Sequence, residues 1–368
     1  MRITAVRARP LNGTIREEVA IVSSLGAHAV GNYVLVEVEA DDGQIGQGEA
    51  TVTAVWSGET QGGTIAMIDL VLAPLLVGAD PFDLAWIERR MAKACFGNSF
   101  ARSAIEMALC DLQGRILNVP LCQLLGGRCP GKTDVRLKFV IGAVEPPIAA
   151  KRARQMVDAG WRAIKVKVGP TANPADDILR LAAVREAIGP DIFLSVDANG
   201  AFTVSDAVRL SREMEILDVA IFEQPTRRGR HREMREVRRR TAIPVMADES
   251  VFTFDDALDL LRAEAADLIS VYPGKHGGMR PTMEIVRLAE AHGVPCTIGS
   301  NLERETATAA MAHLVAASPN LRCERYPGDL IGPLYFTRHS TRTPLDYRAD
   351  RLSVPEGPGL GVQVTADG

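Results

Sequence analysis

Short apolar runs that end in charged residues recur through the middle of the chain. Counted from one terminal charge to the next, the steps from Asp197 to Glu223, Asp248 and Lys275 are 26, 25 and 27 residues. Stretches with helical spacing of apolar positions lie between the runs, for example over residues 205–216. Since a strand, a helix and their loops need about 30 residues, the spacing predicts a repeated strand–helix unit.

Eight apolar runs fit this repeat, and their continuous apolar character is typical of strands buried on both faces of a parallel sheet. Alternating strands and helices predict either a (β/α) barrel or a doubly wound sheet. The expected strands lie near residues 136–142, 163–168, 192–197, 219–223, 244–248, 268–272, 295–299 and 321–324, and the last of them would close a barrel.

The first 125 residues do not show this strand–helix repeat, and their apolar positions predict antiparallel strands followed by helices. Alternating residues predict antiparallel strands near 3–11, 33–39 and 44–49, with Asp41-Asp42-Gly43 as a hairpin turn. Gly43, Gly46 and Gly48 do not follow the G-x-G-x-x-G order of a nucleotide loop. Helices are predicted over residues 65–76, 81–94 and 100–117.

The same patterns divide the chain into three parts. We expect an α+β domain over residues 1–130, a barrel over 131–340, and a Pro- and Gly-rich segment over 341–368 that packs back on the first domain. Residues 12–32 join two strands, and a connection of that length is usually a functional lid or a disordered segment.

Three acidic residues end successive predicted strands. In a barrel every strand delivers its last residue to one rim, so Asp197, Glu223 and Asp248 would converge there. Clustered carboxylates repel one another unless a cation lies among them. Oxygen ligands select a hard divalent ion, and Mg2+ is the usual one.

Three lysines accompany these acids. Lys165 and Lys167 are two residues apart on one predicted strand and therefore point to the same face. Lys275 would arrive from further round the rim. A lysine acts as a base near neutral pH only when its pKa is lowered, and Lys165 together with a metal ion could lower the pKa of Lys167.

Other polar residues near these strand ends have open roles. Glu249 adjoins Asp248, should point the other way along the strand, and could support a lysine from behind the site. Asn199 could contact the site or simply turn the chain. The face taken by Lys138 is not assigned, and His276 is read as a loop histidine rather than a catalytic one.

Substrate contacts are expected from residues 12–32, from the loop with Trp56, and from Ser300, Asn301 and Glu303. Trp56 could stack on a cationic ligand or cap the barrel mouth by apolar packing. Glu303 could accept a hydrogen bond from a substrate or orient a residue of the rim.

Two basic motifs are interpreted as structural. Residues 126–133 fit G-x-x-x-x-G-K-T, but a helix precedes them and a strand follows, which is the reverse of a phosphate-binding loop. This stretch is expected to be a linker. The arginine-rich run at 227–232 is expected to be a solvated face rather than a phosphate site.

Composition narrows the functional class. The 368-residue chain has a formal net charge of −4, which gives no basic footprint for nucleic acid or for an anionic membrane surface. No apolar run approaches the roughly 18 residues of a membrane span, and no secretory signal follows Met1. Six scattered cysteines without a Cys-x-x-Cys pair fit free thiols in a reducing, cytoplasmic setting. A symmetric homo-oligomer is favoured by base rates alone.

Together, the Lys165-x-Lys167 pair, the Asp197, Glu223 and Asp248 series, Lys275, and Gly126-Gly127-Arg128 resemble one family over nearly the whole chain. This is the enolase superfamily, mandelate racemase/muconate lactonizing enzyme family, muconate lactonizing enzyme subgroup. The resemblance implies an N-terminal α+β capping domain, a (β/α)7β TIM-like barrel and one Mg2+. It also implies that Lys167 and Lys275 are acid/base groups on opposite faces of the substrate.

The chemistry that follows is Mg2+-dependent abstraction of the proton α to a small-molecule carboxylate, through an enediolate stabilised by the metal and a nearby ammonium. We expect isomerisation, either cycloisomerisation or racemisation/epimerisation of an amino-acid derivative. Dehydration from the same intermediate is an alternative, although related sugar-acid dehydratases typically have a histidine where Lys275 stands. A non-catalytic binding protein on the same scaffold is a remote alternative, since fold alone does not prove chemistry.

Overall fold

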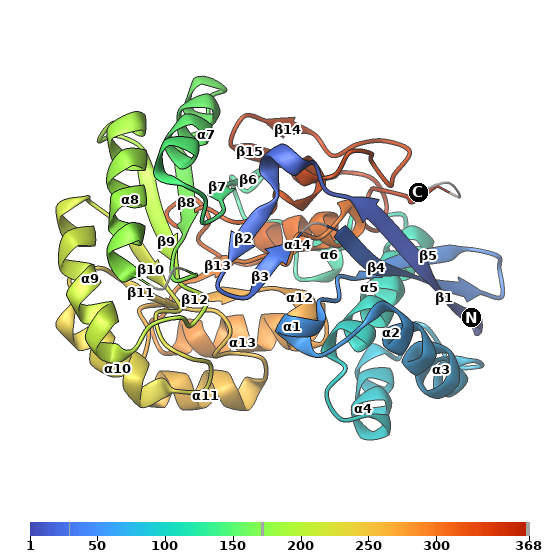
Figure 1. The fold of residues 1–368 in the computed structure, drawn as a ribbon. Helices are drawn as coiled ribbons and strands as arrows, with labels where there is room; N and C mark the ends of the chain where they lie inside the picture. The colour runs from blue at the N-terminus through green and yellow to red at the C-terminus, as the bar shows by residue number, and fades with distance from the viewer. Residues whose placement is uncertain (29, 171–172, 366–368) are drawn as a thin grey trace.

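The computed structural model describes residues 1–28, 30–170 and 173–365. Two lobes lie side by side, an N-terminal lobe and a barrel, and the C-terminal segment runs from the barrel across to the first lobe (Figure 1). No helix of the described residues is both long and apolar enough to cross a bilayer.

The N-terminal lobe is built on an antiparallel sheet in the order β1-β4-β5. The predicted hairpin turn joins β4 to β5, with Glu39 paired to Ile45. Its strands are β1 (Ile3–Thr14), β4 (Val30–Ala40) and β5 (Ile45–Ala50). Its helices are α1 (Ala54–Ser57), α2 (Gln61–Met67), η2 (Ile68–Leu72), α3 (Ala73–Leu76), α4 (Leu84–Ala94), α5 (Ser99–Ile116) and α6 (Leu121–Leu124).

Helix α5 packs directly on the backbone of β5, which explains two of the glycines in this hairpin. A Cβ atom at Gly48 would overlap the carbonyl oxygen of Ala104, and one at Gly46 would overlap that of Ala108. These glycines therefore serve helix–strand packing.

The second lobe is a curled parallel sheet in the order β13-β12-β11-β10-β9-β8-β7, which confirms the predicted capped barrel. Its strands are β7 (Phe139–Ile141), β8 (Ala163–Lys167), β9 (Phe193–Asp197), β10 (Ile221–Glu223), β11 (Val245–Ala247), β12 (Leu268–Val271) and β13 (Cys296–Ile298). The helices that alternate with them are α7 (Pro146–Asp158), α8 (Pro174–Ile188), α9 (Val204–Ile216), α10 (His231–Arg240), α11 (Phe254–Arg262), α12 (Pro273–His276), α13 (Met279–Ala291) and α14 (Glu305–Ala317).

The barrel closes without the continuous eighth strand that we predicted over residues 321–324. Leu321 makes an isolated parallel bridge to Cys296, and Gly328 makes another to Leu137 on the other side of the gap. The backbone N–H of Asp329 also donates to the Ile298 carbonyl at 3.1 Å. An irregular segment thus fills the eighth position.

The first predicted barrel strand, 136–142, is likewise divided. Only Phe139–Ile141 joins the parallel sheet, while β6 (Asp134–Arg136) pairs with β15 (Arg351–Ser353) in a separate sheet that includes β14 (Tyr347–Arg348). The C-terminal segment continues to the N-terminal lobe, where the Val364 N–H donates to Gln47 Oε1 at 2.8 Å. The division of the chain at residues 130 and 340 stays a prediction.

The connection over residues 12–32 is shorter than predicted because β1 and β4 extend into it. It holds η1 (Glu17–Val19) and a small hairpin of β2 (Ile21–Ser23) and β3 (Gly26–His28), which lies between the two lobes (Figure 1). Residue 29 lies outside the described part of the chain.

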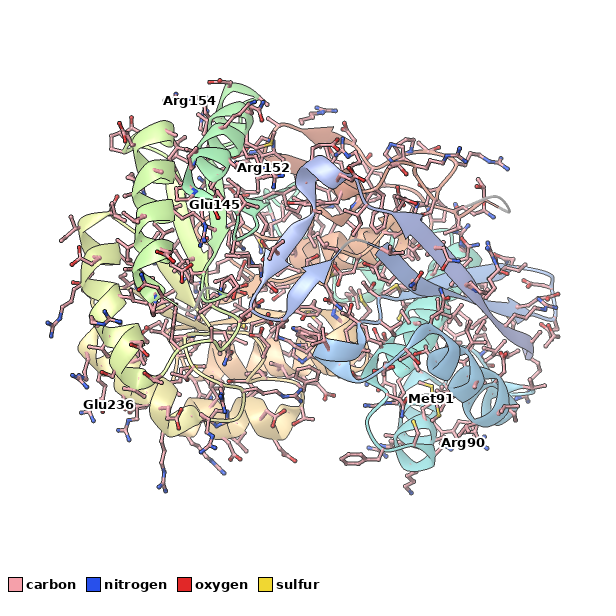
Figure 2. The ribbon with its side chains drawn as sticks, in the orientation of Figure 1. Arg90, Met91, Glu145, Arg152, Arg154 and Glu236 are labelled. Carbon is pink, nitrogen blue, oxygen red and sulfur yellow. The ribbon has the colours of Figure 1, made fainter. Side chains whose placement is uncertain are left out.

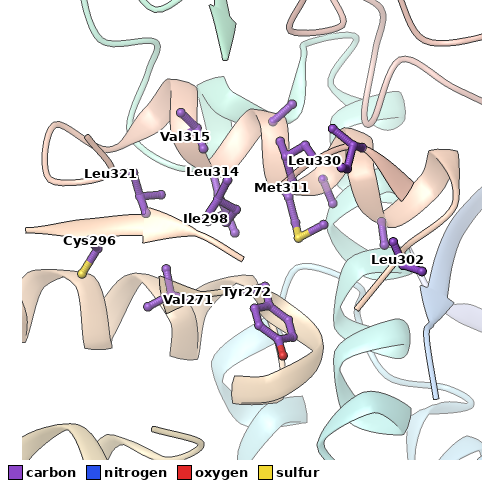
Figure 3. Close-up of a cluster of buried hydrophobic side chains, with 14 of the residues drawn as sticks. Val271, Tyr272, Cys296, Ile298, Leu302, Met311, Leu314, Val315, Leu321 and Leu330 are labelled. Atoms are coloured by element: carbon purple, nitrogen blue, oxygen red, sulfur yellow. The ribbon is translucent and has the colours of Figure 1, made fainter. Parts of the chain in front are cut away.

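The core on the closing side of the barrel fills the space between α14 and the last strands. Figure 3 shows Leu314 and Val315 of α14 beside Ile298 of β13 and Leu321 of the closing segment. Apolar packing therefore holds the irregular segment where a regular strand ladder is missing.

The stretch that resembled a phosphate-binding loop is structural. Lys132 Nζ donates to the carbonyls of Val315, Ser318 and Leu321 at 3.2, 2.5 and 2.7 Å, just beyond the end of α14. A cation at a helix C-terminus satisfies carbonyls that have no partner within the helix. The prediction of a linker thus agrees with the structure.

Candidate active site

A pocket at the carboxyl end of the parallel sheet, which we call the rim pocket, collects most of the predicted site residues. Its apolar wall includes Ile21, Leu25, Val55, Trp56 and Ile331. The polar residues that line it are Ser23, Thr53, Lys165, Lys167, Asp197, Asn199, Glu223, Asp248, Ser300, Asn301 and Asp329.

Strand register explains why these side chains meet. Lys167 pairs with Asp197 across β8 and β9, and Asp197 pairs with Glu223 across β9 and β10. Paired residues in adjacent strands lie at one level, with side chains on the same face and strands about 4.8 Å apart. Asp248 follows β11, and Lys275 lies on α12 directly after β12. The result is a row in the order lysine, aspartate, glutamate, aspartate, lysine across five neighbouring strands.

Lys167 and Asn199 surround the first aspartate of the row. Lys167 Nζ donates to Asp197 Oδ2 at 2.6 Å and to Asn199 Oδ1 at 3.1 Å. Burial opposes ionisation of Asp197, yet the ammonium groups of Lys167 and Lys165 hold the pKa of this carboxyl below its ordinary value. Asp197 therefore stays an anion.

Asn199 also links this aspartate to Glu249. Asn199 Nδ2 donates to Glu249 Oε1 at 2.8 Å, while Glu249 Oε2 is buried without a hydrogen-bond partner among the described residues. Burial and then the charges of Asp248 and Asp197 raise the pKa of Glu249 to about 8. The predicted supporting role for Glu249 thus reaches Lys167 through Asn199.

Lys165 lies under the row and contacts three acids. Its Nζ is 2.7 Å from Asp329 Oδ2, 3.1 Å from Glu223 Oε2 and 3.7 Å from Asp197 Oδ2. Burial opposes its charge, but these three carboxylates raise the pKa of Lys165 well above its ordinary value. Lys165 is a permanent cation here.

Lys275 closes the other end of the row and is completely buried. Its Nζ donates to Asp248 Oδ1 at 2.6 Å, to the Asp248 carbonyl at 2.9 Å and to the Ser270 carbonyl at 2.7 Å. Asp248 lines the rim pocket, whereas Lys275 does not. A direct contact of Lys275 with a substrate stays a prediction.

Two residues of the site were not predicted from the sequence. Asp329 lies in the irregular closing segment and bridges Lys165 and Lys138, whose Nζ is 3.1 Å away. Gln224 turns its buried amide so that Oε1 accepts the N–H groups of Asp248 and Ser250 at 3.0 and 3.2 Å. The only sequence signal for Gln224 was its position directly after Glu223, and Asp329 follows no regular strand.

Lys138 and His276, whose roles were open, are now placed. Lys138, which directly precedes β7, is buried and also donates to the Pro327 carbonyl at 2.6 Å. Its side chain therefore binds the closing segment and does not line the rim pocket. His276 is buried with Nδ1 3.0 Å from the Phe252 carbonyl. Burial and the neighbouring Lys275 charge lower the pKa of His276 well below its ordinary value, so it is neutral.

The predicted substrate contacts divide into two groups. Ser300 and Asn301 line the rim pocket, whereas Glu303 lies behind them and accepts from Ser300 Oγ at 2.5 Å and Asn301 N at 2.9 Å. Burial raises the pKa of Glu303 to about 7 against these hydrogen bonds. The geometry favours the reading in which Glu303 orients the rim.

Trp56 packs against other aromatic rings at the barrel mouth, as one of its two predicted roles requires, while stacking on a cationic ligand stays a prediction. Its ring packs on Phe252, Tyr272 and Phe100 with centroid distances of 4.8, 5.6 and 6.0 Å, and it also lines the rim pocket.

In the arginine-rich run 227–232, Arg228 stacks 3.7 Å over the ring of Phe252 and is otherwise exposed.

The donor chemistry of the row suits a hard divalent cation. Asp197, Glu223 and Asp248 supply only oxygen ligands to one pocket. Burial and then the Asp197 charge raise the pKa of Glu223 to about 7, a crowding that a divalent cation would relieve. Over residues 1–28, 30–170 and 173–365, no group of three or more His, Cys, Asp or Glu side chains is arranged so that it could hold a metal ion as it stands. Each of the three carboxylates contacts a lysine instead.

Comparison with known proteins identifies the family. The model of the mandelate racemase / muconate lactonizing enzyme N-terminal domain matches residues 11–126, and a model described as enolase C-terminal domain-like matches residues 149–368. The chain therefore belongs to the mandelate racemase/muconate lactonizing enzyme family of the enolase superfamily, which confirms the resemblance seen in its sequence.

Several relatives of the chain in this family are isomerases. The chain is 30% identical over 368 residues to the N-succinyl-L-Arg/Lys racemase of Bacillus cereus, covering 100% of this chain and 96% of the relative. It is 34% identical over 335 residues to muconate cycloisomerase 1 of Pseudomonas putida, covering 89% and 87%. The crystal structure of a dipeptide epimerase from Enterococcus faecalis complexed with Mg and the dipeptide L-Leu-L-Tyr matches with a TM-score of 0.92 at 31% identity, covering 98% and 99%. These matches support the prediction of an isomerase.

Proposed function

We propose that the protein is a Mg2+-dependent racemase or epimerase of an amino-acid derivative, acting at the carbon α to the carboxylate. The observation that carries this proposal is the row in which Lys167 and Lys275 stand at opposite ends of Asp197, Glu223 and Asp248. Inversion at a carbon needs a proton acceptor on one face and a donor on the other, and the row supplies one lysine for each.

The lysines have distinct roles in this proposal. One lysine, as the neutral amine, takes the Cα proton, and the C–H electron pair moves into the carboxylate to give an enediolate. The other, as the ammonium, returns a proton to the opposite face. Lys165 remains charged throughout because the carboxylates of Asp329 and Glu223 stabilise its ammonium form. This ammonium offsets the developing negative charge.

Asp197, Glu223 and Asp248 are the residues that would hold Mg2+. Bound there, the ion would supply positive charge against the negative charge that develops on the substrate carboxylate. Gln224 keeps Asp248 in place through its backbone N–H. Lys275 must give up its contact with Asp248 Oδ1 before it can act on a substrate.

Deuterium exchange tests the assignment of the two lysines. In D2O with Mg2+, the protein is expected to incorporate deuterium at Cα of both enantiomers of one member of a panel of N-succinyl amino acids and dipeptides, as followed by NMR. Lys167→Ala should abolish exchange of one enantiomer and Lys275→Ala exchange of the other, and each variant should abolish racemisation.

The matched control is Lys93→Ala on the exposed end of α4, which should leave exchange and racemisation unchanged. Unchanged racemisation in either active-site variant would refute the assignment of that lysine. If the folded protein incorporates no deuterium into any member of the panel in the presence of Mg2+, the proposed reaction is refuted. Incorporation that continues with a chelator in place of Mg2+ would refute its dependence on the metal.

Cycloisomerisation is the second candidate, supported by the 34% identity to muconate cycloisomerase 1. In that reaction a carboxylate adds to a double bond and the resulting enediolate takes one proton, so one of the two lysines is dispensable. Loss of muconate absorbance that persists in either Lys167→Ala or Lys275→Ala would favour this reaction over inversion.

A further inference from the structure

A second hollow lies outside the barrel, on the far side of β7 from the rim pocket, and we call it the α7 groove. It has a volume of about 740 Å³, within the usual range for small-molecule sites. Helix α7 forms one wall, and η1 and η3 (Gly332–Tyr335) form the other.

The floor of the groove is aromatic and rigid. Phe139 stacks on Tyr335 with a centroid distance of 5.6 Å and an interplanar angle of 16°, and it meets Trp161 edge-on at 5.4 Å. Phe139 and Trp161 are 7% and 6% exposed, so both rings are packed in the core and only a small part of each ring faces the groove. Ile148 of α7 is 46% exposed beside them. A flat apolar body fits such a floor.

The rim of the groove is cationic. Arg16, Lys151 and Arg152 line it, and none of the three has an ion-pair partner among the described residues. Glu18 is the one acidic side chain among the residues that line the groove. Other surface arginines, such as Arg209 and Arg238, are paired with aspartates. Within the described part of the chain, the groove therefore gathers three cations without an ion-pair partner and a single acid.

Figure 2 shows Arg152 on α7 beside the ribbon that leads into β2. The Arg16 N–H donates to the Tyr335 carbonyl at 2.9 Å, which ties η1 to η3 across the end of the groove. The chain continues from η1 directly into Ile21, which lines the rim pocket. The two hollows are thus separated by a single strand, and Val140 of β7 lines both.

We propose that the α7 groove is a second ligand site, separate from the rim pocket, that binds a small organic anion with a flat apolar body. The aromatic floor takes the body, and Arg16, Lys151 and Arg152 take the carboxylate. Guanidinium groups suit this task because they pair with carboxylates in two-pronged geometry.

The test uses the full chain and a matched pair of probes, 2-naphthoate and its neutral amide 2-naphthamide, measured by isothermal titration. We expect 2-naphthoate to bind wild type at least tenfold more tightly than 2-naphthamide. Arg152→Gln should weaken 2-naphthoate at least tenfold, and Ile148→Asp should abolish its binding by placing a carboxylate on the floor. Arg154→Gln, an exposed residue of the same helix that does not line the groove, is the matched control and should bind as wild type.

Binding at the rim pocket is separated from binding at the groove by Lys167→Ala, which should leave 2-naphthoate affinity unchanged. The proposal is overturned if 2-naphthoate does not bind at about millimolar concentration, which is the weak end of specific binding. It is also overturned if the amide binds equally well, or if Lys167→Ala rather than Arg152→Gln removes binding. Circular dichroism confirms that each variant is folded. Because the isomerase assay is not used, failure here leaves the proposed reaction untouched.

Discussion

At the scale of single residues, the site is a set of charges that neutralise one another. Lys167 and Asp197, Lys275 and Asp248, and Lys165 with Glu223 and Asp329 are all in contact. Asn199 contacts both charges at one end of the row and carries no charge itself. Its amide therefore sets the direction of the Lys167 ammonium.

Asn199→Ala is expected to lower kcat about 10- to 100-fold, the usual effect of removing a residue that orients a ligand or an acid/base group. Because the site loses hydrogen bonds to Lys167 Nζ, Asp197 Oδ2 and Glu249 Oε1, none of which is a substrate contact, the KM should stay near wild type. The thermal unfolding midpoint should fall slightly, since Asn199 has a left-handed φ of 44° that alanine adopts less readily. Steady-state kinetics and a melting curve measure both. An unchanged kcat would show that Lys167 needs no such orientation.

At the scale of elements, buried glutamates of the N-terminal lobe bind the first turns of helices. Glu49 accepts the N–H groups of Arg304 and Ala307 at the start of α14, and Glu106 accepts those of Met279 and Arg280 at the start of α13. These N–H groups have no partner inside their own helix. Two barrel helices are thus capped by side chains from the other lobe.

Glu106 should make stability fall as pH rises. Burial raises the pKa of Glu106 to about 7 in the folded protein, against an ordinary value of 4.5, so the folded state holds this proton more tightly than the unfolded state. The stabilisation is complete below about pH 4.5 and is lost as pH rises through about 7.

Glu106→Gln should flatten this dependence between pH 5 and 8, and urea unfolding at several pH values measures it. The variant should also be less stable by about 1–3 kcal/mol at low pH, because an amide N–H2 then faces a backbone N–H. Glu236→Gln on the exposed face of α10 is the control. An unaltered pH slope in Glu106→Gln would contradict the assignment.

The contact of α5 with β5 gives a second test at this scale. Gly48→Ala is expected to destabilise the protein by about 1–3 kcal/mol or more, because its Cβ would overlap the Ala104 carbonyl and the helix must move. Gly62→Ala in α2 meets open space and should be neutral or slightly stabilising. Thermal melting of the pair distinguishes overpacking from a general effect of alanine, and equal midpoints would contradict the packing argument.

At the scale of the whole molecule, the hairpin of β2 and β3 joins the lobes over the site. Ser24 Oγ is within hydrogen-bonding distance of the carbonyls of Ala198 and Asn199, at 3.1 and 3.3 Å. The Val22 carbonyl accepts from Ala143 N at 2.8 Å on the other edge. Within the segment predicted as a lid over residues 12–32, Ile21, Ser23, Leu25 and Gly26 line the rim pocket. The function of the segment as a lid stays a prediction.

Ser24→Ala should loosen this cover. Loss of one hydrogen bond of about 1 kcal/mol is expected to raise KM roughly fivefold with little change in kcat. Hydrogen exchange across residues 21–28 should become faster, and Ser24→Thr should restore both measurements. Exchange that remains slow in Ser24→Ala would show that other contacts hold the hairpin.

The sequence predicted most of this molecule because its signals are local and periodic. Seven of the eight expected parallel strands form, and Asp197, Glu223 and Asp248 reach one pocket because each follows or ends its strand. Asp329 could not be found in this way, since an irregular segment places it. Neither could the helix-capping function of Glu49, whose partners are distant in sequence, nor the partners of Lys275, which depend on how Asp248 turns.

The separation of Glu49 from its helix has a consequence for synthesis of the chain. The Arg304 N–H that this carboxylate accepts lies 255 residues downstream. At translation rates of about 5–20 residues per second, the acid waits roughly 10–50 s for its partner to leave the ribosome. The first lobe emerges with buried acceptors whose partners lie in the last barrel helices, so its consolidation waits until most of the chain has been made.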